Sequence, residues 1–263
     1  MMSLTKYNYH SLEANRSYWS ASLFKAFNKC EAAGLAQVTG EYVPELTDSL
    51  LIGSYVDAYF SGAEEFREFR EQYGDRLISK RGGGLLAKFQ QAETMINRVK
   101  DDPLMMDYLA GDHQVIMTAD LFGVPWKAKF DVHGGDRIVD LKTVRDFSGV
   151  YEKGYGWRSW VEAWGYDIQG ALYQRIEQLT TGRAEPLPFY LAAVTKERVP
   201  DIKIVQIPQH ILDGALGLVE AKIDRFDLIK SGEVEPIRCE ACDYCKATKV
   251  LTGPEIYEIE EAS

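Results

Sequence analysis

The segment of residues 130–142, in the middle of the chain, is the feature that most constrains the fold. It reads as a strand, a tight Gly-Gly turn and a second strand. Asp131 lies in the first strand, and Asp140 and Lys142 lie two residues apart in the second. Strand pairing would bring the two carboxylates close together, and Lys142 would share a strand face with Asp140. The hairpin therefore predicts a cluster of two acids and one lysine.

The rest of the pattern predicts an α/β (α+β) fold in which helices flank a small central mixed sheet. The predicted helices are residues 18–37, 49–60, 62–73, 85–100, 158–179 and 209–230, and the predicted strands are residues 113–121, 125–132, 137–143, 188–195 and 202–207. We expect a single domain over residues 1–263. It divides into a helical N-terminal region (18–110), a core (111–230) and a Cys-rich C-terminal segment (231–263).

The composition excludes some classes of protein. The formal net charge of −10 argues against a protein that coats nucleic acid through bulk positive charge. No apolar run approaches the roughly 20 residues that span a bilayer, so no membrane association is expected. The first residues lack the apolar core of a signal peptide, which favours a cytoplasmic protein.

Two acids and a lysine fit metal-dependent hydrolysis of a phosphodiester. Mg²⁺ or Mn²⁺ prefers carboxylate and carbonyl oxygens, so Asp131, Asp140 and the backbone carbonyl of Leu141 are candidate ligands. Lys142 could orient or deprotonate the attacking water and stabilise the developing charge. The alternative is that the acids serve the turn and Lys142 is a surface residue, because short patterns of this kind arise often by chance.

The motif Asp131…Asp140-Leu141-Lys142 resembles the signature of the PD-(D/E)XK nuclease superfamily, with its restriction-endonuclease-like core. Asp57, four residues after Gly53, occupies the place of a metal-binding His in the upstream helical motif of the RecB/RecE-like branch.

Two further stretches extend this similarity. Gln169 and Tyr173 resemble the Gln-x-x-x-Tyr motif of the same branch, and share a helix face at spacing i, i+4. The segments 20–30, 164–167 and 242–245 resemble phage-type RecE-like exonucleases.

This resemblance implies a metal-dependent DNA exonuclease in which Asp57, Asp131 and Asp140 bind Mg²⁺ and Lys142 assists the water. Gln169 and Tyr173 would position DNA or a catalytic group. Such enzymes resect duplex ends in phage or prophage recombination, beside a single-strand annealing protein, and are often ring-like homo-oligomers. The alternative function is a non-catalytic DNA-binding protein, or a structural protein carrying iron–sulfur or zinc, on the same fold.

The four cysteines of the chain are Cys30, Cys239, Cys242 and Cys245. In a reducing compartment their spacing favours metal or cluster ligation over disulfides. Some RecB-like nucleases carry an iron–sulfur cluster with one ligand before the nuclease core and three after it, so the resemblance implies a [4Fe–4S] cluster. Zn²⁺ and unligated thiols are the alternatives, and the tight spacing of the last two cysteines leaves the cluster type open.

Basic and aromatic residues near the hairpin are candidates for DNA binding. We expect sequence-tolerant contacts with phosphates. The predicted basic contacts are Lys80, Arg81, Lys127, Lys129, Arg145 and Arg158. The aromatic residues Tyr151, Tyr155, Trp157 and Trp160 would either stack on unpaired bases or pack a helix.

Overall fold

A five-stranded mixed sheet lies at the centre of the computed structural model, which describes residues 2–80, 82–152, 154 and 156–254. The strands, in spatial order, are β1 (Asp112–Leu121), β2 (Val124–His133), β3 (Ile138–Val144), β6 (Phe189–Thr195) and β7 (Ile202–Gln206). β3 and β6 are parallel, whereas the other neighbours are antiparallel. The predicted mixed sheet, with its strands in these places, is confirmed.

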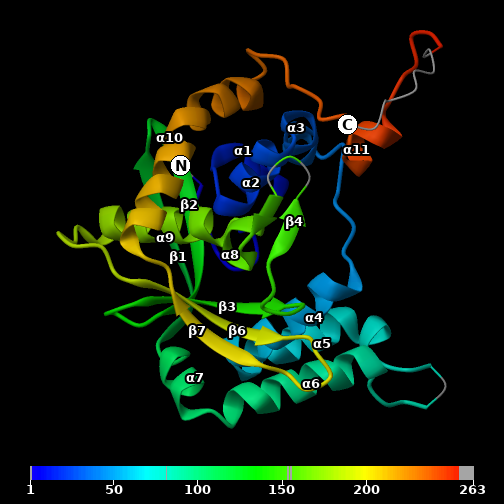
Figure 1. Cartoon of the computed structure of the whole chain (residues 1–263), viewed down its shortest axis with the longest axis vertical. Helices are drawn as coiled ribbons and strands as arrows, with labels where there is room; N and C mark the ends of the chain where they lie inside the picture. The colour runs from blue at the N-terminus through cyan, green and yellow to red at the C-terminus, as the bar shows by residue number, and fades with distance from the viewer. Residues whose placement is uncertain (1, 81, 153, 155, 255–263) are drawn as a thin grey trace.

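Helices cover both faces of the sheet (Figure 1). One layer contains α2 (Ala21–Lys29), α3 (Glu31–Thr39), α9 (Tyr166–Thr181) and α10 (Gln209–Ser231). The other contains α4 (Asp48–Ser61), α5 (Ala63–Leu77), α6 (Ala87–Lys100) and α7 (Pro103–Tyr108). Residues of β6 alternate between the two cores: Phe189 and Leu191 pack with the first layer, and Ala192 and Val194 with the second. The sheet is therefore buried on both sides.

The prediction of one helix over residues 18–37 is wrong. Cys30 has extended backbone angles, with φ −162° and ψ 113°, and separates α2 from α3. A Cβ at Gly34 would lie 2.5 Å from the Phe27 ring and 2.9 Å from its Cα, so the two helices meet in a corner that only glycine permits. Cys30 consequently lies at a corner between helices and not on a helix face.

The prediction of one helix over residues 158–179 is also wrong. A short hairpin of β4 (Val150–Glu152) and β5 (Gly156–Arg158) comes first. The helix α8 (Trp160–Ala163) then begins at Ser159, which forms a capping box with Glu162. Gly165, with φ +61°, separates α8 from α9.

Three short helices were not predicted, namely α1 (Leu12–Ser17), α7 and α11 (Asp243–Ala247). Asp102 and Pro103 show why α7 was missed. A proline just after the predicted helix of residues 85–100 is typical of a helix end, yet Asp102 caps a new helix that has Pro103 in its first turn. Among the described residues, no helix has the length and apolar character to cross a lipid bilayer.

Gly170 tests the packing of α9 on the sheet. A Cβ there would lie 2.5 Å from Cδ1 of Phe189 and 3.0 Å from Cδ2 of Leu212. We expect Gly170→Ala to lower the free energy of unfolding by about 1–3 kcal/mol through overpacking. Gly214→Ala on α10 is the matched control, because its Cβ meets nothing within 4 Å. The control should be neutral or stabilising by up to about 1 kcal/mol. Urea unfolding measures both, and equal effects would contradict the packing argument.

Candidate active site

β2 and β3 separate where the two predicted acids lie. The last residues paired along this part of the ladder are Val132 and Val139, so Asp131 has no partner in β3. The backbone N–H of Leu141 donates to Oδ2 of Asp131 instead, at 2.9 Å. Because the N–H and C=O of one strand residue point to the same edge, the Leu141 carbonyl also faces the opening between the strands.

Asp140 is held at both carboxylate oxygens. Its side chain is 1% exposed. Nε2 of Gln169, on α9, donates to its Oδ1 at 2.7 Å, and Nζ of Lys142 forms an ion pair with its Oδ2. The sequence-predicted Asp140, Lys142 and Gln169 thus form one contiguous network, whose geometry fixes the orientation of the Asp140 carboxylate.

Asp57 reaches the site from α4, one helical turn after Gly53. A Cβ at Gly53 would lie 2.9 Å from Oγ1 of Thr143 on β3, so glycine allows the helix to approach the sheet. Asp57 and Asp131 consequently line the same cavity. The side-chain nitrogen of Gln114, on β1, lies 3.5 Å from both oxygens of Asp57.

Electrostatic repulsion between the acids of the site makes ionisation of each one less favourable. Burial, followed by repulsion from Asp140 and Asp57, raises the pKa of Asp131 well above its usual value. Burial also raises the pKa of Asp57, although Lys129 and Lys142 act in the opposite direction. Burial alone would lower the pKa of Lys142, but Asp140 and Asp131 outweigh it and raise that pKa. Lys142 therefore remains a cation among acids.

This set of donors fits a hard divalent cation. Asp57, Asp131 and Asp140 offer only carboxylate oxygens, and the Leu141 carbonyl faces the same opening. Because the acids repel one another, a bound cation would relieve an unfavourable charge. A site of this kind can bind Mg²⁺ or Mn²⁺ without supplying nitrogen or sulfur ligands.

Two adjoining cavities give access to the acids. The larger, of about 570 Å³, is lined by Asp57, Asp131, Lys142 and Gln169. The smaller, of about 270 Å³, is also lined by Asp57 and Asp131. Tyr173 faces only the smaller cavity, and burial raises the pKa of its hydroxyl. Gln169 and Tyr173 therefore share a helix face, as predicted, but Gln169 lines the larger cavity and Tyr173 the smaller.

Lys25 is a residue of the larger cavity for which we predicted no role. Its Nζ lies 3.5 Å from Oε1 of Gln169 and 3.4 Å from the carbonyl of Trp164. Burial and the neighbouring Lys142 lower its pKa to about 8. Lys25 lies in the segment that resembles RecE-like exonucleases, but a lysine on an amphipathic helix is usually a solvated surface residue.

The predicted DNA contacts fall into separate groups. Arg145 lines the larger cavity and Lys129 the smaller. Lys127 also lines the smaller cavity, but it is 1% exposed and its Nζ donates to the Tyr9 carbonyl and to Oδ1 of Asn15. Burial lowers its pKa to about 8. Contact between Lys127 and a phosphate would therefore require these bonds to break.

Of the other predicted contacts, Lys80 and Arg158 do not line either cavity. Lys80 lies in the loop between α5 and α6, at one end of that helical layer (Figure 1), and Arg81 lies outside the described residues. Arg158, on β5, forms an ion pair with Glu152 at 2.8 Å. The predicted DNA contacts of Lys80 and Arg158 therefore gain no support from their positions relative to the acids.

The aromatic residues divide between surface and core. Tyr151 and Trp157 lie on the β4–β5 hairpin, with 64% and 76% of their surface exposed. Trp160 is buried against Phe147. Tyr155 lies outside the described residues. The base-stacking interpretation thus remains a prediction for the two exposed residues, whereas Trp160 packs the core.

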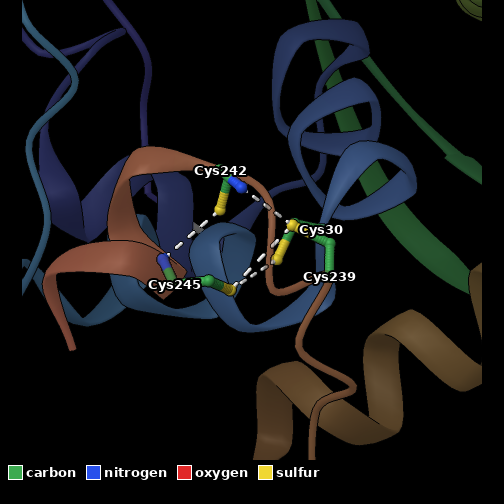
Figure 2. A group of neighbouring side chains, drawn as sticks. All are labelled: Cys30, Cys239, Cys242 and Cys245. Carbon is green, nitrogen blue, oxygen red and sulfur yellow. Dashed lines mark hydrogen bonds between the residues drawn. The ribbon is translucent and has the colours of Figure 1, made fainter. Parts of the chain in front are cut away.

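The four cysteines come together outside both cavities (Figure 2). Their sulfur atoms all lie within 4.8 Å of one another. Cys30 comes from the corner between α2 and α3, and the other three from the C-terminal segment. A metal could bind to this group, which we call the cysteine site.

Comparison with known proteins agrees with this geometry. A crystal structure of a protein from Eubacterium rectale, described as a "Putative exonuclease", is 40% identical to this chain, with a TM-score of 0.91 over 97% of each chain. A crystal structure of SSO0001 is 14% identical over 85% of this chain and 91% of that one, with a TM-score of 0.30, too low to support an inference. No curated protein matches.

The family model of a PDDEXK-like domain of unknown function, DUF3799, matches residues 20–248. This match covers both layers of helices and the whole sheet. Together with the Eubacterium rectale structure it supports a nuclease. The chain belongs to the PDDEXK-like family DUF3799.

Proposed function

We propose that this protein is a metal-dependent exonuclease that hydrolyses phosphodiester bonds at DNA ends. One observation carries the proposal. Asp57 and Asp131 line a cavity that also contains Lys142, and burial, followed by repulsion from the nearby Asp140 and from Asp57, raises the pKa of Asp131. Such a cluster of acids costs folding stability, and a bound cation would offset that cost.

Asp57, Asp131, Asp140 and the Leu141 carbonyl would hold Mg²⁺ or Mn²⁺. The cation would supply charge neutralisation at the phosphate and lower the pKa of the attacking water. The protein's own part is to hold the oxygens in place. The Leu141 N–H fixes one oxygen of Asp131, and Gln169 fixes one oxygen of Asp140.

Lys142 is the residue best placed to act on the reacting atoms. Its ammonium group pairs with Asp140 and lines the larger cavity. Because the neighbouring acids keep it protonated, it would orient the attacking water and stabilise charge that develops on the phosphate. Gln169 would act through Asp140, as a positioning residue.

DNA would enter along the basic edge of the larger cavity. Lys25, Arg145 and Lys196 line it together with the exposed Trp164. Contacts of this kind recognise phosphates and do not read base sequence. The exposed Tyr151 and Trp157 lie on a hairpin whose Val150 also lines the cavity, so they could stack on bases of an opened end.

The biological setting of the proposal rests on the resemblance to RecE-like exonucleases. In this setting the protein would resect DNA ends in phage or prophage recombination. It would act beside a single-strand annealing protein and as a homo-oligomer.

Substitution of the central pair tests the activity. Asp140→Asn and Lys142→Met should each lower the rate of hydrolysis of end-labelled linear duplex by at least about 100-fold, because each removes charge at the reacting phosphate. Asp120→Asn, an exposed acid on β1, is the matched control and should retain the wild-type rate. EDTA should abolish wild-type hydrolysis.

Covalently closed circular DNA has no ends, so an endonuclease can cleave it and an exonuclease cannot. We expect the wild-type protein to leave such circles intact. Cleavage of circles as fast as linear duplex would contradict action at ends. Equal inactivity of the wild type and both variants on linear DNA would favour a non-catalytic DNA-binding protein.

The repulsion among the acids predicts that Asp131→Asn stabilises the metal-free protein. A raised pKa in the folded state means that ionised Asp131 opposes folding at neutral pH. The variant should gain about 1–2 kcal/mol of unfolding free energy at pH 7. The difference in unfolding free energy between the wild type and the variant should shrink as the pH falls through the raised pKa of folded Asp131. It should vanish below the pKa of Asp131 in the unfolded chain. Denaturant unfolding with and without Mg²⁺ measures this, and a destabilised variant at pH 7 would argue against repulsion.

Lys25 should contribute to DNA binding. Lys25→Met removes a cation from the cavity beside Gln169, so we expect weaker binding of a DNA end and a shallower salt dependence. Lys29→Met is the matched control, since Lys29 is exposed on the same helix and outside both cavities. Fluorescence anisotropy with a labelled duplex, in Ca²⁺ in place of Mg²⁺, measures affinity at several salt concentrations. Equal losses for the two variants would exclude a specific role.

A further inference from the structure

The geometry of the cysteine site identifies the kind of metal that fits it. Sγ of Cys30 lies 3.6 Å from Sγ of Cys245, and Sγ of Cys239 lies 3.9 Å from Sγ of Cys245. All four sulfur atoms are within 4.8 Å of one another. They are also too far apart to be disulfide-bonded, and all four cysteines are free.

These distances match a single tetrahedral ion. With metal–sulfur bonds of about 2.3 Å, the sulfurs of a four-thiolate site lie about 3.8 Å apart. In a [4Fe–4S] cluster each thiolate binds a different iron and points away from the cluster centre, which separates the sulfurs by roughly 6 Å. The predicted [4Fe–4S] cluster therefore does not fit. We propose that the cysteine site binds one Zn²⁺ ion through four thiolates.

The local backbone is arranged for thiolate ligands. The N–H of Cys242 donates to Sγ of Cys239 at 3.3 Å, and the N–H of Cys245 lies 3.5 Å from Sγ of Cys242 (Figure 2). Such bonds stabilise negative charge on sulfur. Four protein ligands close the coordination shell and leave no position for a substrate, so this zinc is structural.

The zinc would hold the C-terminal segment against the corner between α2 and α3. The apolar contact there is small: Cys30, Cys245 and two alanines form the buried cluster. The helix α11 has only five residues, too few to be stable alone. Glu31 accepts a hydrogen bond from the backbone N–H of Ile237 and forms an ion pair with Arg225. Since Cys30 directly follows α2, the ion would also stabilise the helix that carries Lys25 into the active-site cavity.

Metal analysis of anaerobically purified full-length protein tests this inference, whatever its nuclease activity. Inductively coupled plasma mass spectrometry should find one zinc per chain, and no iron, in a colourless protein. Replacing zinc by Co²⁺ should give the intense visible bands of a tetrahedral tetrathiolate. Brown protein containing iron and sulfide, or protein without metal and with oxidised cysteines, would overturn the proposal.

Two variants locate the ion. Cys239→Ser/Cys242→Ser removes the two more exposed ligands and should lose the zinc after dialysis against EDTA. Its α11 amides should exchange faster in hydrogen–deuterium exchange. Asp140→Asn should lose nuclease activity and keep its zinc, so a failure of the active-site proposal is distinguishable from a failure of this one. Zinc retained in full by the double cysteine variant would place the ion elsewhere.

Discussion

Repulsion among Asp57, Asp131 and Asp140 is the constraint to which the rest of the active site responds. Each acid comes from a different element, and specific contacts hold two of them. The N–H of Leu141 holds Asp131, while Gln169 and Lys142 hold Asp140. These contacts keep the carboxylates together although burial raises the pKa of Asp131. The repulsion among these acids thus costs folding stability at a place where a bound cation would restore it.

The fold provides the space for this cluster by separating two strands. β2 and β3 form a ladder near their turn and then diverge, so that backbone and side chains face a cavity instead of a neighbouring strand. Glycine lets α4 approach from one side, and α9 packs closely through Gly170 on the other. Outside the cavity, the four cysteines bring together the corner after α2 and the C-terminal segment. The helix α2 thereby lies between the cysteine site and the active-site cavity.

Much of the site could be predicted from the sequence because short-range geometry determines it. Residues two apart on a strand, such as Asp140 and Lys142, must share a face, and so must Gln169 and Tyr173 on a helix. The identity of their partners could not be predicted in this way. That Gln169 bonds to Asp140 depends on how α9 crosses the sheet.

The predictions that failed or were missing also depend on tertiary contacts, which local sequence patterns do not reveal. Lys127 is buried by the N-terminal segment, and Lys25 enters a cavity formed by elements far apart in the sequence. Helix periodicity continued through Cys30 and Gly165, where the backbone departs from helical angles. The spacing of the cysteines is compatible with a cluster or with zinc, and the proposal of zinc rests on the distances between the sulfur atoms.

We propose that Asp57, Asp131 and Asp140 bind the cation used in hydrolysis. Anomalous diffraction from crystals grown with Mn²⁺ tests it most directly, because the ion's position is observed without reference to activity. We expect an anomalous peak in contact with Asp131, Asp140 and the Leu141 carbonyl, with Asp57 as a further ligand. A peak at any other place, or none at a Mn²⁺ concentration that supports hydrolysis, would contradict it.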